Sequence, residues 1–292
     1  MSIVSRKILV PIGFSEQSMI ALEQAFNLAK IKKSEIVLLS VIEDQNMIES
    51  LFLDDKTHEL QQKVNEKLSE IGKEYSEKYG VPVETMVARG KVYEKIIDIS
   101  EMVNANLIVM GTNGTPKGVV KKFIGSNAQR VVRLAYCPVI TIKGKEHKNG
   151  CKNIFLPLDL EKETKEKVTL AIEYARYWNA TIRIVSVLLS DKKEIKQHLL
   201  RNLKQVEDFI SNAELKCTTE LLKNKKGIGL AESILDYEKN FEFDLILIMT
   251  RQEGVFSGRI GSIARSIIYH SEVPVMSIKP HQLKNVPSPF TY

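Results

Sequence analysis

The sequence predicts an α/β fold of two doubly wound, mostly parallel five-stranded sheets with flanking helices. Short apolar runs rich in Val and Ile alternate with longer stretches that have helical spacing, which is typical of α/β proteins. The second half of the chain also repeats the first. A length of 292 residues agrees with this organisation, because it leaves room for about two domains of ~100–200 residues each.

The elements of the first half can be assigned in chain order. The first predicted helix begins after Ser15, a residue type that caps helix N-termini. The second and third helices span 57–79 and 91–103, and a fourth begins at Ser126. Since this alternation builds an open parallel sheet, we expect a ligand at the carboxyl ends of its strands. The predicted strands are 7–12, 35–42, 82–88, 106–110 and 138–142.

The repeat divides the chain into two domains. KILVPI at 7–12 matches NIFLPL at 153–158, and the Gly-Ser pair at 125–126 matches the pair at 261–262. The segment between the halves is polar and contains glycine, which is typical of a linker. The predicted parts are domain one at 1–143, a linker at 144–152, domain two at 153–281 and a C-terminal tail at 282–292.

The stretch 110–127, MGTNGTPKGVVKKFIGSN, is the most informative segment for function. It follows an apolar run and precedes a helical pattern. Glycines let a backbone approach a ligand closely, and a helix N-terminus offers unpaired N–H groups at the positive end of a dipole. We therefore predict a phosphate site. In the alternative interpretation, the glycines only turn the strand into a loop and cap the helix.

This stretch resembles the nucleotide-binding loop of the universal stress protein family, G-x2-G-x9-G-[ST], with one residue more between its second and third glycines. The resemblance covers both halves, through KILVPIGFSE and CPVITIK in the first and NIFLPLDLE and VPVMSIK in the second. It implies a tandem universal stress protein with sheets like those of the adenine-nucleotide alpha-hydrolases. It also implies that the two domains pair through their last strands as a pseudo-twofold dimer.

The resemblance further implies that domain one binds ATP or AMP, with Mg²⁺ accompanying the phosphates of ATP. ATP-binding members have an aspartate at the end of the first strand, where this chain has Gly13. A hydrogen bond to a charged group contributes ~1.5–3 kcal/mol, so its loss weakens binding about 10- to 100-fold. The residues expected to contact the nucleotide are Pro11, Ile12, Gly13, Val41, Met110, Gly111, Asn113, Gly114, Gly125, Ser126 and Asn127.

Domain two keeps the first-strand aspartate that domain one lacks, but it loses the glycines of the loop. The aspartate is Asp159, and we align Thr250 and Glu253 with Gly111 and Gly114. A carboxylate at the position of a phosphate is repulsive. We therefore expect domain two to be a degenerate site that binds no triphosphate.

Composition and charge favour a cytoplasmic protein without nucleic-acid or membrane partners. The net charge is +6, but lysines alternate with glutamates, as at 161–167, which is typical of solvated helix faces. No apolar run approaches the ~20 residues of a membrane span, and we find no signal peptide at the N-terminus. Three cysteines without a Cys-x-x-Cys pair suit a reducing compartment.

No catalytic or metal-ligating residue is predicted. The chain lacks Gly-x-Ser-x-Gly and HExxH motifs, and its five histidines show no metal-ligand spacing. Any enzymatic activity would be at most slow ATP hydrolysis. The sequence thus leaves two hypotheses: a stress-response protein that binds adenine nucleotide, or a non-catalytic interaction module whose two nucleotide sites have decayed.

The last strand of each half predicts how the domains assemble. VITI at 139–142 and VMSI at 275–278 carry no charge, and bare edge strands invite pairing. A linker of about ten residues reaches at most ~33–36 Å, which is enough to cross such an interface. We expect the halves to dock within one chain, and further self-association into a homodimer through helix faces is compatible with the sequence.

Overall fold

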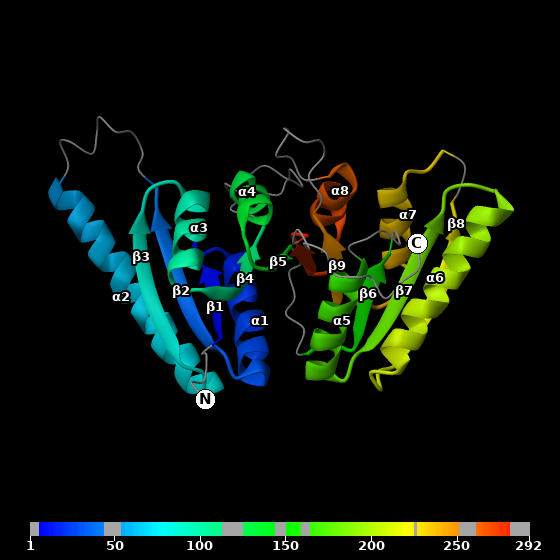
Figure 1. The fold of residues 1–292 in the computed structure, drawn as a ribbon. Helices are drawn as coiled ribbons and strands as arrows, with labels where there is room; N and C mark the ends of the chain where they lie inside the picture. Colours follow the sequence, from blue (N-terminus) through cyan, green and yellow to red (C-terminus); the bar gives the residue numbers. More distant parts are fainter. Residues whose placement is uncertain are drawn as a thin grey trace. The chain divides into compact units, whose positions relative to one another are not determined.

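The computed structural model describes residues 6–43, 54–112, 125–143, 150–158, 164–224, 227–250 and 261–280. The chain divides into two compact units, Met1–Asn149 and Gly150–Tyr292. In each of them strands and helices alternate along the chain (Figure 1). The predicted α/β class is therefore confirmed, and the two units are described one at a time.

The first unit is a parallel sheet in the order β3-β2-β1-β4-β5. The chain moves outward from β1 to β3 and then returns to place β4 on the other side of β1. Such a reversal of strand order opens a crevice at the carboxyl ends of the two strands that flank it. The elements are β1 (Lys7–Pro11), α1 (Glu16–Lys32), β2 (Glu35–Ile42), α2 (Asp54–Tyr79), β3 (Val83–Arg89), α3 (Val92–Met102), β4 (Ala105–Gly111), α4 (Ser126–Leu134) and β5 (Val139–Ile142).

The second unit has the same plan, with the order β8-β7-β6-β9-β10 and parallel pairing. Its reversal of strand order falls between β6 and β9. The prediction of two mostly parallel, five-stranded sheets is confirmed in the described part of the chain. The elements are β6 (Asn153–Pro157), α5 (Thr164–Trp178), β7 (Thr181–Leu188), α6 (Lys193–Ser211), β8 (Cys217–Lys223), α7 (Leu230–Glu238), β9 (Leu245–Met249), α8 (Ser262–His270) and β10 (Val275–Ile278).

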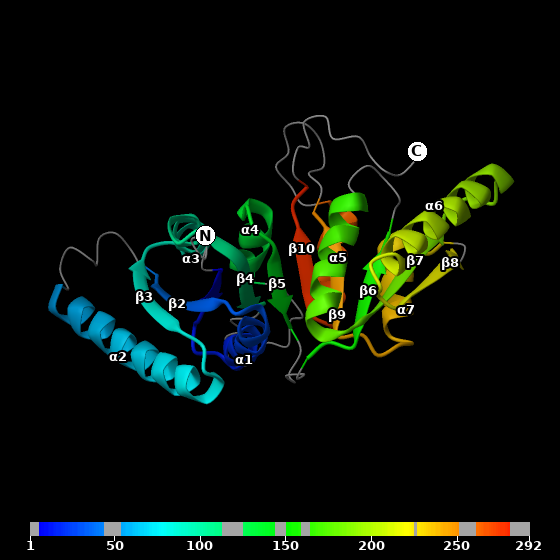
Figure 2. The same cartoon turned by 60° about the horizontal axis from the view of Figure 1, so that its bottom comes forward.

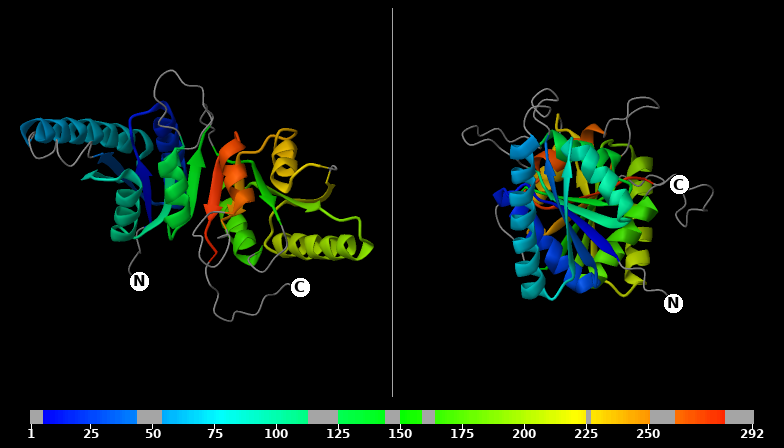
Figure 3. Two further views of the ribbon diagram at one scale, coloured as in Figure 1. Left: turned by 90° about the horizontal axis from the view of Figure 1, so that it is seen from above. Right: turned by 90° about the vertical axis from the view of Figure 1, so that its left-hand side faces the viewer.

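Helices cover both faces of each sheet. In the first unit α1 packs beside α2, and α3 packs beside α4 on the opposite face (Figure 3). In the second unit α5 lies beside α6 (Figure 2), and α7 lies beside α8. Because both faces are covered, the central strands are buried along their length, as Leu9 and Ile108 illustrate with 0% exposure. This double burial explains why the strands appear in the sequence as continuous apolar runs.

Local signals set the ends of α1. The Ser15 hydroxyl accepts a hydrogen bond from the Ser18 N–H at 3.3 Å, which confirms the predicted N-cap. At the other end Lys33 adopts a left-handed conformation with φ of 51°, and its N–H donates to the Ala29 carbonyl. Stacked aromatic rings then hold α1 against α2, with the Phe26 and Tyr79 centroids 5.2 Å apart. This packing holds the C-terminal half of α1 against the end of α2.

Candidate functional site

The carboxyl ends of β1, β2 and β4 bring the predicted residues of the first unit together. Pro11 ends β1, and Ile12 follows it, buried, with its N–H donating to the Leu39 carbonyl of β2 at 2.7 Å. Gly13 is exposed immediately beyond. Val41 lies one residue before the end of β2 and is half-buried. These residues lie together at the carboxyl ends of β1 and β2, which is where a doubly wound sheet binds its ligand.

The remaining predicted residues lie at the end of β4 and the start of α4. Met110 is buried in β4, and Gly111 ends that strand. The Gly125 N–H donates to the Thr112 carbonyl at 2.8 Å, so the two ends of the glycine-rich stretch meet beside the sheet. Ser126 then begins α4 and is exposed. The predicted residues Asn113 and Gly114 lie outside the described residues.

The N-terminus of α4 is suited to an anion. Its N-cap is Gly125, which supplies no side-chain hydrogen bond to the first turn. The first N–H groups of a helix have no intrahelical partner, and here the N-cap residue offers them no side-chain acceptor. Ser126 is exposed and Asn127 half-buried in that turn. Together with the positive end of the helix dipole, this arrangement can bind a phosphate group.

The glycines of the site have different physical roles. A Cβ built on Gly111 would lie 2.9 Å from the backbone carbon and oxygen of Gln17 in α1. Gly111 is therefore required by the close approach of α1 to β4, whatever it does for a ligand. A Cβ on Gly13 would meet none of the residues that the structure describes within 4 Å. Among these residues, none obstructs a larger side chain at Gly13.

The structure adds residues near this site that the sequence analysis did not select. Phe14 has a φ of 55°, which is uncommon for a residue other than glycine, and the Lys67 ammonium lies 4.8 Å from its ring centroid. The Arg130 guanidinium of α4 stacks over Tyr93 of α3 at 4.5 Å. Arg130 lies one helical turn after Ser126 and so on the same side of α4. No sequence motif marks these residues.

A charged network lies next to the Arg130 stack. The Tyr93 hydroxyl donates to the Glu94 carboxylate at 2.7 Å, and the Lys91 ammonium donates to the same oxygen at 3.0 Å. The Tyr93 hydrogen bond, followed by that from Lys91, lowers the pKa of Glu94. The same contact with Glu94 raises the pKa of Lys91. Both groups are therefore charged at neutral pH.

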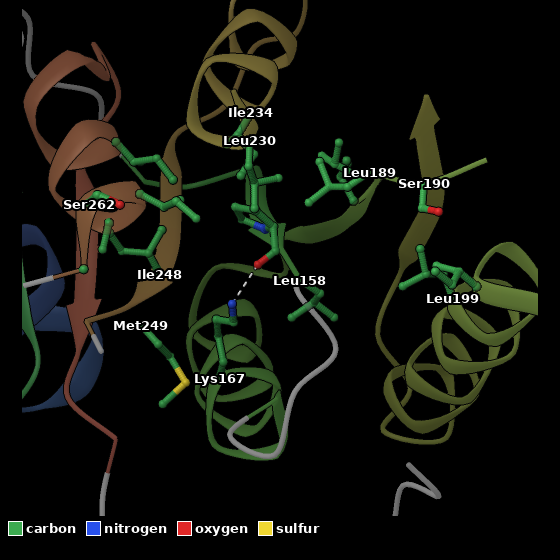
Figure 4. A pocket seen from close by; sticks show the side chains of 18 residues that line it. Leu158, Lys167, Leu189, Ser190, Leu199, Leu230, Ile234, Ile248, Met249 and Ser262 are labelled. Carbon is green, nitrogen blue, oxygen red and sulfur yellow. Dashed lines mark hydrogen bonds between the residues drawn. The ribbon is translucent and has the colours of Figure 1, made fainter. Parts of the chain in front are cut away.

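In the second unit a cavity of about 500 Å³ lies at the corresponding strand ends (Figure 4). Pro157 and Leu158 line it where Pro11 and Ile12 stand in the first unit, and the Leu158 N–H donates to the Val185 carbonyl as Ile12 does to Leu39. The start of α8 also lines the cavity. Its N-cap, like that of α4, is a glycine without a side-chain hydrogen bond.

The structure corrects our alignment of the two loops. The Thr250 N–H and hydroxyl both donate to the Ile278 carbonyl, as those of Thr112 donate to the Ile142 carbonyl. Thr250 therefore corresponds to Thr112, and the position of Gly111 is taken by Met249. The alignment erred because it counted residues through a loop of different length. Glu253 and Asp159, on which the degenerate site was predicted, lie outside the described residues.

The cavity of the second unit is mostly aliphatic. Its walls include Val187 of β7, Ile234 of α7 and Ile248 of β9. One charged side chain lines it as well: Lys167 of α5 is 4% exposed, and its ammonium donates to the Pro157 carbonyl at 2.7 Å (Figure 4). The alternating lysines and glutamates of 161–167 predict a solvated helix face. For Lys167 that interpretation is wrong, because the side chain points into the unit.

The cysteines give no sign of a reactive site. Cys137 is buried, and burial raises the pKa of its thiol to about 12, so it is protonated at neutral pH. Burial also raises the pKa of the half-buried Cys217. Within the described residues no group of three or more His, Cys, Asp or Glu side chains is placed to hold a metal ion. Nor does that part contain a helix with the length and apolar character needed to cross a bilayer.

Strand order, parallel pairing and helices on both faces define each unit as a doubly wound α/β domain. The sequence profile of the universal stress protein family matches residues 5–143 and again residues 150–279. The chain therefore belongs to the universal stress protein family and carries two of its domains in tandem. The membership predicted from the residues is confirmed.

Individual relatives match one domain at a time. Universal stress protein MJ0531 of Methanocaldococcus jannaschii is 31% identical over 145 residues, covering 47% of this chain and 82% of that protein. Universal stress protein YxiE of Bacillus subtilis is 30% identical over 147 residues, covering 47% and 98%. The crystal structure of a universal stress protein from Archaeoglobus fulgidus matches across both domains, with a TM-score of 0.78 at 23% identity over 95% of this chain and 100% of that one. This last likeness shows that the shared fold is present in both domains.

Proposed function

We propose that the first unit binds an adenine nucleotide, ATP or AMP, and that the protein is a regulatory binding protein of the stress response. The observation that supports this most strongly is the start of α4. There Gly125 leaves the first turn without a side-chain cap, and its N–H bond to Thr112 places that turn at the end of β4. A phosphate group bound there would accept hydrogen bonds from the exposed N–H groups.

The adenosine part would lie at the ends of β1 and β2. Val41 is half-buried and offers apolar surface there, and the exposed Gly13 admits a ring close to the backbone. Mg²⁺ would arrive with the phosphates of ATP, because it commonly keeps several waters and takes few protein ligands. The exposed Ser126 hydroxyl is an oxygen suited to join its shell. Among the described residues we assign no group that would activate water for hydrolysis.

Titration of the full chain with ATP and AMP tests this proposal. We expect one nucleotide per chain, with Gly13→Asp binding about 10- to 100-fold more tightly because a carboxylate would accept a hydrogen bond from the ribose. The open space at Gly13 allows the change without a clash. Gly13→Asn is the matched control, since it has the same shape without the charge and should gain less. Absence of heat at millimolar nucleotide would overturn the proposal.

The second candidate function is an interaction module without nucleotide. Gly111 favours it, because the contact with Gln17 explains that glycine by packing alone. Gly13 also favours an interaction module, because it stands where ATP-binding members of the family have an aspartate. Under this hypothesis Gly13→Asp would leave nucleotide binding undetectable, because the phosphate site itself would be lost. The titration therefore separates the two candidates.

We propose further that the two units pair through their last strands. β5 and β10 are short, uncharged and rich in β-branched residues, and each ends the strand order of its own unit. Edge strands of this kind are stabilised by pairing. Pairing within one chain would make the two units a pseudo-twofold dimer, and association of two chains through helix faces would then give a homodimer.

A further inference from the structure

The cavity of the second unit is lined by aliphatic side chains at positions where the first unit has small or polar residues. Where the first unit has Gly111 and Asn127, the second has Met249 and Ile263, and both of these line the cavity. In Figure 4, Leu199 of α6 lies across the cavity from Met249. A volume of about 500 Å³ is within the ~300–1,000 Å³ of small-molecule sites. The cavity is therefore large enough for a ligand, and its walls are mostly apolar.

Three of the residues that line the cavity are large, apolar and exposed to solvent. Leu189 directly follows β7 and is 61% exposed, Ile195 of α6 is 40% exposed, and Ile263 of α8 is 42% exposed. Because each of them borders both the cavity and the solvent, they lie where the cavity opens. Exposed apolar surface that is grouped in this way is typical of binding sites. A ligand that fills the cavity and reaches its opening would remove this surface from water, which stabilises the complex.

Polar groups of the wall are already paired within the protein. The Lys167 ammonium donates to the Pro157 carbonyl at 2.7 Å. The Leu158 carbonyl accepts a hydrogen bond from the Ser186 hydroxyl at 2.9 Å. A charged group is costly to bury unless it is paired. Since these polar groups have partners of their own, the cavity favours a ligand without charge.

We propose that this cavity is a binding site for a neutral aliphatic molecule of medium chain length. One end of the hydrocarbon chain lies between Val187, Ile234 and Ile248, and the other reaches the opening beside Ile195. The strand ends that would hold a nucleotide in the first unit thus hold an uncharged ligand in the second. This assignment does not depend on nucleotide binding by the first unit.

The chain length of the ligand gives a direct signature. Each methylene moved from water into an apolar site contributes ~0.8 kcal/mol, which is about three- to fourfold in affinity. Titration of the full chain with 1-hexanol, 1-octanol and 1-decanol should therefore show affinity rising by roughly ten- to fifteenfold from one alcohol to the next. Affinity that does not rise with chain length would overturn the proposal.

A matched pair of probes tests the charge of the ligand. Decanoate has the same number of carbon atoms as 1-decanol but carries a carboxylate in place of the hydroxyl group. Because a carboxylate is costly to bury in an apolar site, we expect decanoate to bind more weakly than 1-decanol by about tenfold or more. Decanoate that binds as tightly as 1-decanol, or more tightly, would overturn the assignment of a neutral ligand.

A matched pair of variants on α6 assigns the ligand to this cavity. Ile195 lines the cavity, whereas Leu200 is similarly exposed, at 46%, and is not among the described residues that line it. Ile195→Gln should weaken 1-decanol about three- to tenfold, because it removes apolar contact surface. Leu200→Gln makes the same kind of change away from the cavity and should leave binding unchanged. Equal affinities of these two variants would place the ligand elsewhere and overturn the proposal.

A third variant fills the cavity from β7. Val187→Phe adds a ring where the hydrocarbon chain would lie and should abolish binding of 1-decanol, with circular dichroism as the check on the fold. Should this variant fail to fold, the two variants on α6 still decide the matter, because both change exposed residues. A folded Val187→Phe protein that binds 1-decanol as the wild type does would show that the ligand lies outside this cavity.

Discussion

Gly111 allows a quantitative test of how β4 and α1 pack. Replacement by alanine would bring a methyl group to 2.9 Å from the carbonyl carbon and oxygen of Gln17, and both are backbone atoms that cannot rotate away. Overpacking of a well-packed core costs ~1–3 kcal/mol. We therefore expect Gly111→Ala to lower the free energy of unfolding by about that amount. Urea denaturation followed by circular dichroism measures it as a lower midpoint.

Gly13→Ala is the control for this experiment. A Cβ at Gly13 meets no described residue within 4 Å, and Gly13 is not among the described glycines with positive φ. Alanine at a compatible position stabilises by ~0.4–1 kcal/mol through the unfolded state. The two variants should thus shift the urea midpoint in opposite directions. A Gly111→Ala protein as stable as Gly13→Ala would refute the close approach of α1 to β4.

Three further predictions concern pH, thiol reactivity and assembly. Burial raises the pKa of Glu238, which accepts hydrogen bonds from Ser271 Oγ and two backbone N–H groups. The contribution of Glu238 to the free energy of unfolding is therefore full below its unfolded pKa and is lost as pH rises through its folded pKa. Urea titrations should show Glu238→Gln gaining stability relative to wild type from acid to neutral pH, whereas stabilities of the two proteins that change in parallel with pH would contradict this. Cys217 should react with a thiol reagent before the buried Cys137, as mass spectrometry of the labelled peptides would show, and the reverse order would be inconsistent with their burial. A protease site inserted at 144–149 and then cut should leave two halves that elute together in size-exclusion chromatography, whereas separate elution would contradict pairing of the units.

Much of the fold could be predicted from the sequence, because each local signal agrees with the tertiary structure. The apolar runs become strands buried on both faces, and Ser15 caps the helix that it was expected to begin. Boundaries were less accurate where charged residues continue a helix: the helix expected at 57–79 begins at Asp54. Charge alone does not mark an end, since an exposed helix start tolerates any polar residue.

The cavity of the second unit could not be predicted, for two physical reasons. Lys167 stands in a charged stretch, and its burial depends on a contact with Pro157 that only the packing of α5 against β6 creates. The position of Met249 was hidden by the unequal loops, because hydrogen bonds to β10 rather than residue counts set the correspondence. Likewise, the Gln17 contact that explains Gly111 is tertiary. Sequence patterns locate strand ends, but they do not say what fills the space between them.

The most direct test of nucleotide binding by the first unit is a titration of ATP into two matched variants of the full chain. Ser126 and Ser262 are both exposed and both begin a glycine-capped helix, α4 in one unit and α8 in the other. A glutamate favours folding at either position but repels a phosphate bound there. We predict that Ser126→Glu abolishes ATP binding and that Ser262→Glu leaves it unchanged. Unchanged binding in Ser126→Glu, or its loss in Ser262→Glu alone, would contradict the assignment.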